Sequence, residues 1–483
     1  MSDVSHRTRM LVLSICCMSL LMVSLDNTVL NVALPSMRRE LNASVAGMQW
    51  TIDAYTLVLA SLLMLAGSTA DRIGRRKVFI AGLALFTFGS LLCSMAPDLE
   101  WLIVFRMIQA LGGAMLNPVA MSIITNTFTE PAQRARAIGI WGAVAGISMA
   151  AGPMVGGLLV DTIGWRSIFW INIPVGLLAL ALTLHYVPES RADRPRRPDP
   201  VGQLLVMALL GSLTYGIIEA PAAGWTSGLI LGCAAVALAS LVGLLLYEPR
   251  RTEPLIDPRF FRSAPFSGAT VIAVCAFAGM AGFLFLNTLY LQDVRGLDAL
   301  DAGLYMLPMA ACTFLFAPVS GRLVGARGPR LPLLIAGVAM AASGLLFAVF
   351  NAETSTPLMF TGYVLFGLGF GMVNAPITNT AVSGMPRAQA GVAAAVASTS
   401  RQTGGTLGVA VVGAVLAAGM EGGADFGSAT GPAWWIITVC GLFVLVVGAV
   451  SSGPWAMATA ERTARTLEPP QASPSPAGAP PHV

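Results

Sequence analysis

The chain has 483 residues, of which 55% are hydrophobic and only 11% are charged, and its formal net charge is +4. A water-soluble protein carries about 25% charged residues, so this composition excludes a soluble globular protein. The few basic residues are scattered, which argues against binding to nucleic acid. We therefore expect an integral membrane protein that lies in the lipid bilayer.

Apolar segments long enough to cross a bilayer recur along the whole chain. Each is an uncharged or nearly uncharged run of about 18 residues or more. The predicted spans are residues 10–36, 47–69, 78–97, 101–126, 137–160, 167–187, 201–219, 225–247, 264–290, 302–321, 331–351, 357–383, 390–418 and 433–455. These fourteen spans, an even number, place both termini on the same side of the membrane.

The basic residues of the connecting segments predict the orientation. If the N-terminus is cytoplasmic, 22 Lys and Arg fall in cytoplasmic segments and 4 fall in outside loops. Lys and Arg are enriched on the cytoplasmic side of membrane proteins, so we expect both termini in the cytoplasm and a location in the inner (cytoplasmic) membrane. The loops are too short to house a soluble domain, so any chemistry must take place among the helices.

The two halves of the chain share a sequence pattern. Gly67 and Gly74, after the second span, recur at the same spacing as Gly321 and Gly328, after the tenth. Two similar bundles around a central site are typical of alternating-access transporters. We predict an all-α polytopic fold of two six-helix bundles plus two inserted helices. Its parts are a cytoplasmic N-terminus (1–9), an N-terminal bundle (10–190), a linker with two additional helices (191–262), a C-terminal bundle (263–455) and a disordered cytoplasmic tail (456–483).

Four motifs give the chain a family resemblance. They are LDNTVLNVALP (25–35), GSTADRIGRRK (67–77), RMIQALGGAMLNP (106–118) and GISMAAGPMVGG (146–157). In this order and at these spans they resemble the signatures of the major facilitator superfamily, in particular its fourteen-span drug:proton antiporters. The resemblance implies the major facilitator fold and an export activity driven by protons, but it does not specify the substrate.

Charged residues inside the spans are the candidates for proton coupling. A carboxylate at Asp26 costs several kcal/mol in the membrane and therefore marks a function; it could carry a proton inward. Asp53, near the outer start of the second span, is the other candidate, and which of the two is the principal proton site stays open. Arg106 needs a buried partner, for which Asp26 is one candidate, and the resemblance implies a role in proton transfer with Gln109 beside it. The structural alternative is a static lock between helices.

Two further groups follow from the motifs. The loop after the second span is expected to act as a conformational latch. Its arginines could instead simply anchor the loop on the cytoplasmic side of the membrane, where basic residues are enriched. The latch residues are Gly67, Asp71, Arg72, Gly74, Arg75 and Arg76. In the fifth span, small residues permit close helix contact and a proline bends the helix. The residues of this antiporter helix are Gly146, Gly152, Pro153, Gly156 and Gly157.

Polar residues in the second bundle are candidates for a substrate cavity. They are Asn287, Tyr290, Asn374, Arg401 and Gln402. No Asp or Glu lies inside the last six spans, and a dication would need more than one carboxylate. We therefore favour a neutral or monocationic amphiphile, with an anion possible through Arg401.

The expected function is proton-coupled efflux of hydrophobic drugs or antibiotics by alternating access. The alternatives are proton-coupled uptake of a small organic solute on the same fold, a non-transporting membrane sensor or a membrane enzyme. Three distant histidines and seven cysteines without a CxxC pair predict no metal site, and no GxxxxGK[ST] motif occurs. We therefore expect no enzyme activity and no cofactor, with the proton gradient as the energy source, and a monomer.

Overall fold

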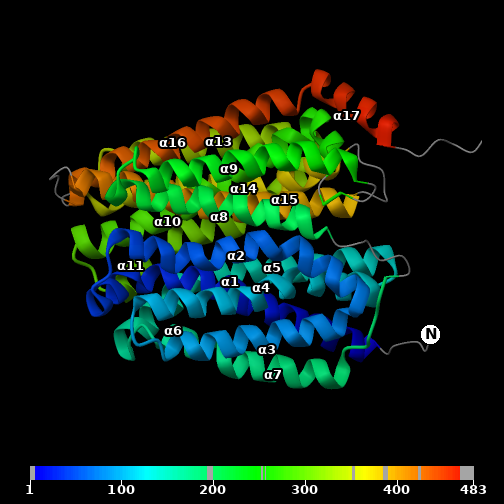
Figure 1. Cartoon of the computed structure of the whole chain (residues 1–483), viewed down its shortest axis with the longest axis horizontal. Helices are drawn as coiled ribbons and strands as arrows, with labels where there is room; N and C mark the ends of the chain where they lie inside the picture. The colour runs from blue at the N-terminus through cyan, green and yellow to red at the C-terminus, as the bar shows by residue number, and fades with distance from the viewer. Residues whose placement is uncertain are drawn as a thin grey trace, which may run out of the picture.

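The structure, a computed structural model, describes residues 6–192, 199–251, 254–255, 257–350, 354–383, 390–421 and 426–467. Within these residues the regular structure is entirely helical, and long helices run side by side in two bundles (Figure 1). Thirteen of these helices are long and apolar enough to cross a membrane, and α5 (Pro131–Thr162) lies at the predicted position of the remaining span. The predicted fold class is confirmed.

The N-terminal bundle begins with one helix for each of its first five spans. Its helices are α1 (His6–Leu41), α2 (Val45–Ile73), α3 (Arg75–Ser94), α4 (Leu99–Thr127), α5, α6 (Ser167–Trp170) and α7 (Asn172–Tyr186). The side chains of Ser44 and Asp98 accept hydrogen bonds from the first turns of α2 and α4 and so fix where these helices begin. Tyr55, Phe79 and Phe86 are fully buried in the core of this bundle.

The C-terminal bundle repeats this arrangement. Its helices are α10 (Ala264–Leu289), the π-helical turn η3 (Tyr290–Val294), α11 (Ala299–Tyr305), α12 (Leu307–Arg327), α13 (Arg330–Phe347), α14 (Thr356–Val382), α15 (Ala390–Glu421) and α16 (Phe426–Ser451). Buried aromatic rings hold it together. The rings of Phe283 and Phe366 stack with their centroids 4.1 Å apart, and those of Phe347 and Trp434 stack at 4.7 Å.

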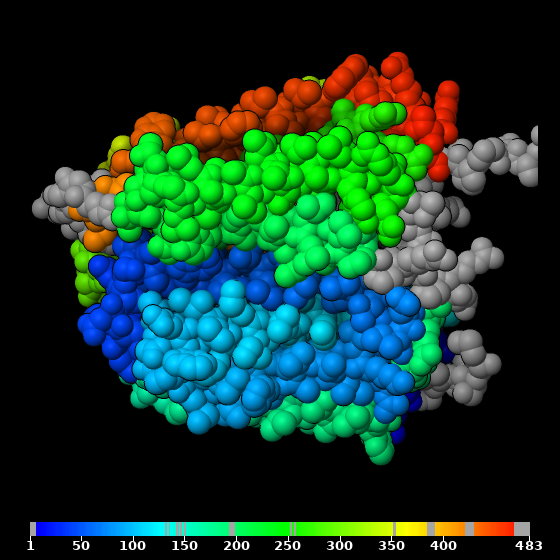
Figure 2. Space-filling view, viewed as in Figure 1, coloured from blue at the N-terminus to red at the C-terminus, as the bar shows by residue number. Residues whose placement is uncertain are grey.

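Two inserted helices, α8 (Pro200–Ala223) and α9 (Gly228–Tyr247), lie on one side of the molecule. α8 packs against α2 of the first bundle and α15 of the second, and α9 packs against α8. Gln203 Nε2 donates to the carbonyl oxygen of Ser61, and Trp50 Nε1 donates to Glu219 Oε1 at 2.7 Å. In Figure 2 this green pair covers the face between the two bundles.

The segment after residue 455 differs from the prediction. Residues 456–467 were expected to belong to a disordered tail, but Pro454–Leu467 forms helix α17. Ala456, Ala460 and Leu467 are buried, and α17 packs against α10. The prediction is wrong for this part because the buried face of α17 is built mainly of small residues, which give little hydropathy signal. Residues 468–483 lie outside the described part of the chain.

The two bundles meet at the end of the molecule that carries α6 and α11, on the left in Figure 1. Gln49 Nε2 on α2 donates to the carbonyl oxygens of Ala410 and Val409 on α15, at 2.8 and 3.1 Å. Gln292 Nε2 donates to Val32 O at 2.9 Å. Side-chain amides inserted between helix backbones therefore clamp the bundles together at this end.

Glycines allow a second close approach at the same end, between α5 and α11. A Cβ atom on Gly303 would overlap the carbonyl oxygen of Pro153, and one on Gly157 would overlap that of Ala299. The Asp161 carboxylate accepts a hydrogen bond from Leu300 N at 2.6 Å. The backbones of the two bundles are thus in direct contact, and a larger residue at either glycine would force them apart.

Candidate functional site

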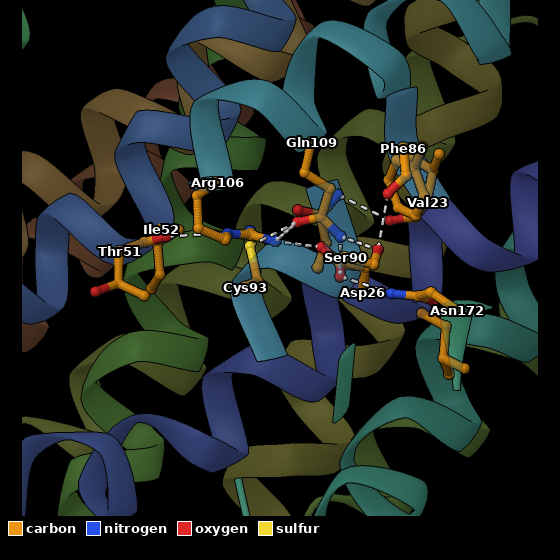
Figure 3. A network of polar contacts seen from close by, with 12 residues as sticks. Val23, Asp26, Thr51, Ile52, Phe86, Ser90, Cys93, Arg106, Gln109 and Asn172 are labelled. Atoms are coloured by element: carbon orange, nitrogen blue, oxygen red, sulfur yellow. Dashed lines mark hydrogen bonds and ion pairs between the residues drawn. The ribbon is translucent and has the colours of Figure 1, made fainter. Parts of the chain in front are cut away.

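A buried network of polar side chains lies in the middle of the N-terminal bundle, centred on Asp26 (Figure 3). Asp26 is 3% exposed and comes from α1, and Arg106, from α4, is fully buried. Arg106 Nη1 donates to Asp26 Oδ2 at 2.5 Å. Asp26, one of the candidate partners for Arg106 from sequence, is therefore the partner that the fold supplies.

Gln109 connects the two charged groups. One turn after Arg106 on α4, its Oε1 accepts from Arg106 Nη1 at 2.7 Å, while its Nε2 donates to Asp26 Oδ1 at 2.8 Å. The same Nε2 donates to Ser90 Oγ on α3 at 2.8 Å, and Asn172 Nδ2 at the start of α7 donates to Asp26 Oδ1 at 3.0 Å. Three hydrogen-bond donors, one of them the charged guanidinium, therefore converge on one carboxylate.

Arg106 is also held from the side of α2. Its Nε donates to Thr51 O at 3.3 Å, and its guanidinium carbon lies 4.2 Å from the ring centroid of Tyr55. A cation at this distance is attracted to the face of an aromatic ring. Among the described residues, Nη2 of Arg106 has no hydrogen-bond partner. The guanidinium is thus positioned by α1, α2 and α4 together, and a change in its pairing would be transmitted to all three helices.

Protonation of Asp26 would disrupt this network. A neutral carboxyl group would leave Arg106 as an uncompensated buried cation, which costs several kcal/mol. Gln109 cannot adapt simply, because rotating its amide to accept from a protonated Asp26 would turn its NH₂ group toward the guanidinium. The arrangement can therefore convert the binding of one proton into a rearrangement of helices.

Asp53 does not belong to this network. It is fully buried on α2, and its Oδ1 lies 3.4 Å from Thr56 Oγ1. Thr56 Oγ1 is in turn 3.0 Å from Thr406 Oγ1 on α15, so Asp53 borders the contact between the bundles. Within the described residues Oδ2 of Asp53 has no hydrogen-bond partner and no cation pairs with it. A buried carboxylate without a cation is costly in its charged form.

The predicted latch loop is fastened to its own bundle. Asp71 Oδ1 accepts from Arg75 Nη2 at 2.8 Å, and Arg75 N donates to Ser190 O at 2.9 Å. Gly74 has φ +126°, and a Cβ atom there would lie 2.6 Å from Glu189 Oε1. A glycine is therefore required where the chain turns between α2 and α3, and the segment after α7 supplies the partner groups.

The remaining latch residues have different surroundings. Arg76 Nη2 donates to Leu184 O at 2.5 Å. A Cβ atom on Gly67 would be in ordinary contact with Pro118 at 3.7 Å. Arg72 has an exposed side chain and forms no ion pair within the described part of the chain.

The antiporter helix α5 lies between α1 and the second bundle. A Cβ atom on Gly152 would overlap Thr28 Oγ1, and one on Gly156 would lie 3.0 Å from Val29 Cγ1. Gly157 and Pro153 face α11, as described above. Gly146 is part of α5, but its surroundings lie outside the described part of the structure. The small residues of α5 thus bring two separate neighbours close to its backbone.

The structure separates the predicted cavity residues into two places. Asn287 is fully buried and accepts from Tyr363 OH at 2.7 Å, and Tyr290 is 2% exposed at the same end of the C-terminal bundle. Arg401 Nη2 donates to Thr378 Oγ1 at 2.6 Å, one turn after Asn374 on α14. Because Tyr363 and Asn374 are eleven positions apart on one helix, the two places lie about 16 Å apart.

Arg401 has surroundings that suit a ligand contact better than those of Asn287. Its guanidinium carbon is 5.9 Å from the ring centroid of Phe277, its side chain is half-buried, and Gln402 beside it is half-buried as well. Asn287 and Tyr290 instead lie within the packed aromatic core. In this conformation the five residues are thus divided between two places along α14.

Several site residues were not singled out from sequence. Asn172, Ser90 and Thr51 contact the central network, Gln49 clamps the bundles, and Glu189 holds the latch loop. An Asn two positions before a Pro in an apolar run was a signal for Asn172, because an amide inside a membrane needs partners. The others are ordinary in helices or loops and carry no distinguishing pattern.

Taken together, two helical bundles that span a membrane and enclose a buried ionisable network define a polytopic membrane protein of the transporter class. The chain belongs to the Major Facilitator Superfamily, whose family model matches residues 16–409. The predicted family is thereby confirmed.

Similar proteins include exporters of antibiotics. The chain is 41% identical to the Multidrug resistance protein Stp of Mycobacterium tuberculosis over 416 residues, which are 86% of this chain and 77% of that protein. It is 38% identical to the Tetracenomycin C resistance and export protein of Streptomyces glaucescens over 398 residues, 82% of this chain and 74% of that protein. Both similarities extend over most of the membrane-spanning region.

A solved structure has the same fold. A bacterial homologue of the human lysosomal transporter Spinster, in an inward-facing and unoccupied conformation, superposes with a TM-score of 0.63. The alignment covers 96% of this chain and 98% of that one at 20% identity.

Proposed function

We propose that the protein exports hydrophobic drugs or antibiotics from the cytoplasm in exchange for protons, in the inner (cytoplasmic) membrane and with both termini in the cytoplasm. Membership of the superfamily and the names of the relatives, which refer to drug resistance and export, support export. The observation that carries the proton coupling is the buried ion pair between Asp26 and Arg106, which lies inside the bundle and away from the lipid-facing surface. The proton gradient would be the energy source, with no cofactor, and a monomer is sufficient.

The charge bias of the loops supports an orientation with the clamped end of the molecule outside. Gln49, Gln292 and Gly303 then hold the outer ends of the bundles together, so the structure corresponds to a conformation closed toward the outside. In such a conformation a compound can reach the interior from the cytoplasm or the inner leaflet. Opening of the outer end must separate these contacts.

The mechanism follows from the network. In the conformation closed to the outside, the donors from Arg106, Gln109 and Asn172 stabilise ionised Asp26. After the outer end has opened and the compound has left, water can deliver a proton to Asp26. Loss of the ion pair then favours rearrangement of α1 and α4, and the proton is released on the cytoplasmic side when the pair forms again.

The test is a flux measurement with the purified chain in proteoliposomes of known orientation. With an inward-directed proton gradient, a cationic dye or antibiotic should be moved outward, and adding substrate without a gradient should move protons in the opposite direction to the substrate. Asp26→Asn should abolish the coupled proton movement while binding of the substrate is retained.

Two results would contradict the proposal. Protons and substrate moving in the same direction would indicate the uptake symporter, and the absence of proton-dependent flux for every compound tested would favour a sensor. A matched control is Glu130→Gln, which removes an exposed carboxylate at the start of α5 and should leave the coupling unchanged.

A further inference from the structure

A groove on the side of the N-terminal bundle has no part in the proposed transport cycle. It lies between α2, α3 and α4, near the end of the molecule where α2 ends and α3 begins, and encloses about 280 Å³. Its floor consists of small or buried side chains from the three helices, namely Ala66, Val78 and Ala114. Leu111 and Ile73 at its rim are 37% and 51% exposed. The groove is therefore open to the acyl-chain region of the bilayer.

A polar cavity of about 380 Å³ continues this groove toward the loop between α2 and α3. Thr69 and Ile73 line both spaces, and the polar cavity adds Ser68 and Arg72. Lys77, at the start of α3, lines the apolar groove. The apolar groove thus adjoins two cations and two hydroxyl groups, at the height where the helix spans give way to a loop.

The four basic residues of this loop divide into two pairs. Arg75 is paired with Asp71, and Arg76 donates to Leu184 O, so both are used to fasten the loop. Arg72 and Lys77 are exposed and have neither an ion pair nor a hydrogen bond within the described part of the chain. These two free cations are the ones at the groove.

We propose that this groove binds an anionic phospholipid, with an acyl chain between α2, α3 and α4 and the phosphate between Arg72 and Lys77. The apolar groove matches a hydrocarbon chain, the free cations match a phosphodiester, and Thr69 can donate to its oxygens, whereas the Ser68 hydroxyl already donates to Leu65 O. Basic pockets between spans at the loop end of a membrane protein are suited to anionic headgroups. Binding would link the lipid directly to the loop held by Asp71 and Arg75.

The experiment is native mass spectrometry of the full chain in detergent with added phosphatidylglycerol or phosphatidylcholine. A one-to-one complex with phosphatidylglycerol is expected at several-fold higher occupancy than with phosphatidylcholine. The double variant R72Q/K77Q should remove this preference. A matched control is R322Q/R327Q, which neutralises two exposed cations of the equivalent loop in the second bundle and should retain it.

A second variant tests the apolar part. Ala81→Phe places a ring in the groove and should lower the occupancy of both lipids, whereas Ala235→Phe, on the exposed face of α9, should not. Equal occupancy of the two lipids, or an unchanged preference in R72Q/K77Q, would overturn the proposal. If dodecyl phosphate binds at this site and phosphatidylglycerol does not, the ligand is a single-chain anion and the proposal is also wrong. Each outcome is read from binding alone and is independent of transport.

Discussion

Asp26 and Arg106 are 80 positions apart in the chain, yet their side chains form an ion pair of 2.5 Å with almost no exposure to solvent. Breaking a buried pair by removing one partner destabilises a protein much more than removing both, because the remaining charge is uncompensated. Removing one partner of this pair should therefore change the stability of the protein as well as its transport activity.

Asp26→Asn should abolish proton-driven export and lower the free energy of unfolding by about 3–5 kcal/mol, since Arg106 is left as a buried unpaired cation. The double variant Asp26→Asn/Arg106→Gln should recover most of the stability but none of the export. The measurements are thermal unfolding in detergent and drug efflux from cells that lack their own pumps. Normal export by either variant would exclude the pair from the mechanism.

Asn172→Ala should shift the pH dependence of transport. Asn172 Nδ2 donates to Asp26 Oδ1, and a donor of this kind stabilises the ionised carboxylate. Without it the proton is held more tightly, so release to the cytoplasm should require a higher pH and the activity profile should move in the alkaline direction. The profile is measured as initial flux against internal pH. The control is Asn27→Ala, because the Asn27 side-chain amide donates to Val23 O on its own helix, and an equal shift there would refute the assignment.

Gly303→Val should open the outer end. Its added side chain would collide with the backbone of α5 at Pro153, and a packed contact of this kind cannot absorb two methyl groups without separation of the helices. A cysteine pair at positions 38 and 293, where Arg38 and Asp293 form an ion pair at 3.1 Å, should be cross-linked by a short bifunctional thiol reagent in the parent chain and much less in the variant. Gly232→Val, where α9 offers free space, should leave the cross-link yield unchanged.

Asp53→Asn should keep the outer end closed regardless of pH. A buried carboxylate with no cation partner is tolerated when it carries a proton and favours opening and hydration when it does not. In the chain with native Asp53, the cross-link between positions 38 and 293 should therefore decrease as the pH rises, whereas in Asp53→Asn it should stay constant. A pH dependence that survives the substitution would assign the effect to another group.

The sequence alone was sufficient to predict the number and order of the spans. The length of an apolar run and the preference of Arg and Lys for the cytoplasmic side are both local properties of the sequence. It was also sufficient to identify Asp26 and Arg106 as candidates, since a buried charge is rare. The partners Ser90 and Asn172 could not be found in this way. Whether a neutral polar side chain faces a carboxylate or a neighbouring backbone depends on helix rotation, which hydropathy does not specify.

The dependence on helix rotation also explains why the residues predicted to line one cavity lie in two places. Asn287 and Arg401 are both polar residues in apolar spans of the second bundle, yet one is enclosed by aromatic rings and the other is half-buried beside Thr378. The Gln49 clamp was likewise beyond sequence reasoning, because its acceptors are backbone carbonyl groups, which every residue possesses. Contacts of that kind are visible only after the bundles have been placed against each other.

The position of α8 gives the molecule an asymmetry that its two similar halves do not suggest. Two seams run along the boundary between the bundles, one at α2 and α15 and the other at α5 and α12. Helices contact each other directly at both seams, but at the first α8 also packs against both α2 and α15, with α9 as its outer layer, and these two inserted helices have no comparable contact with α5 or α12 in the described part of the chain. We therefore expect a lipophilic substrate dissolved in the bilayer to enter laterally through the second seam, between α5 and α12. Access from the membrane would then be confined to one side of the protein.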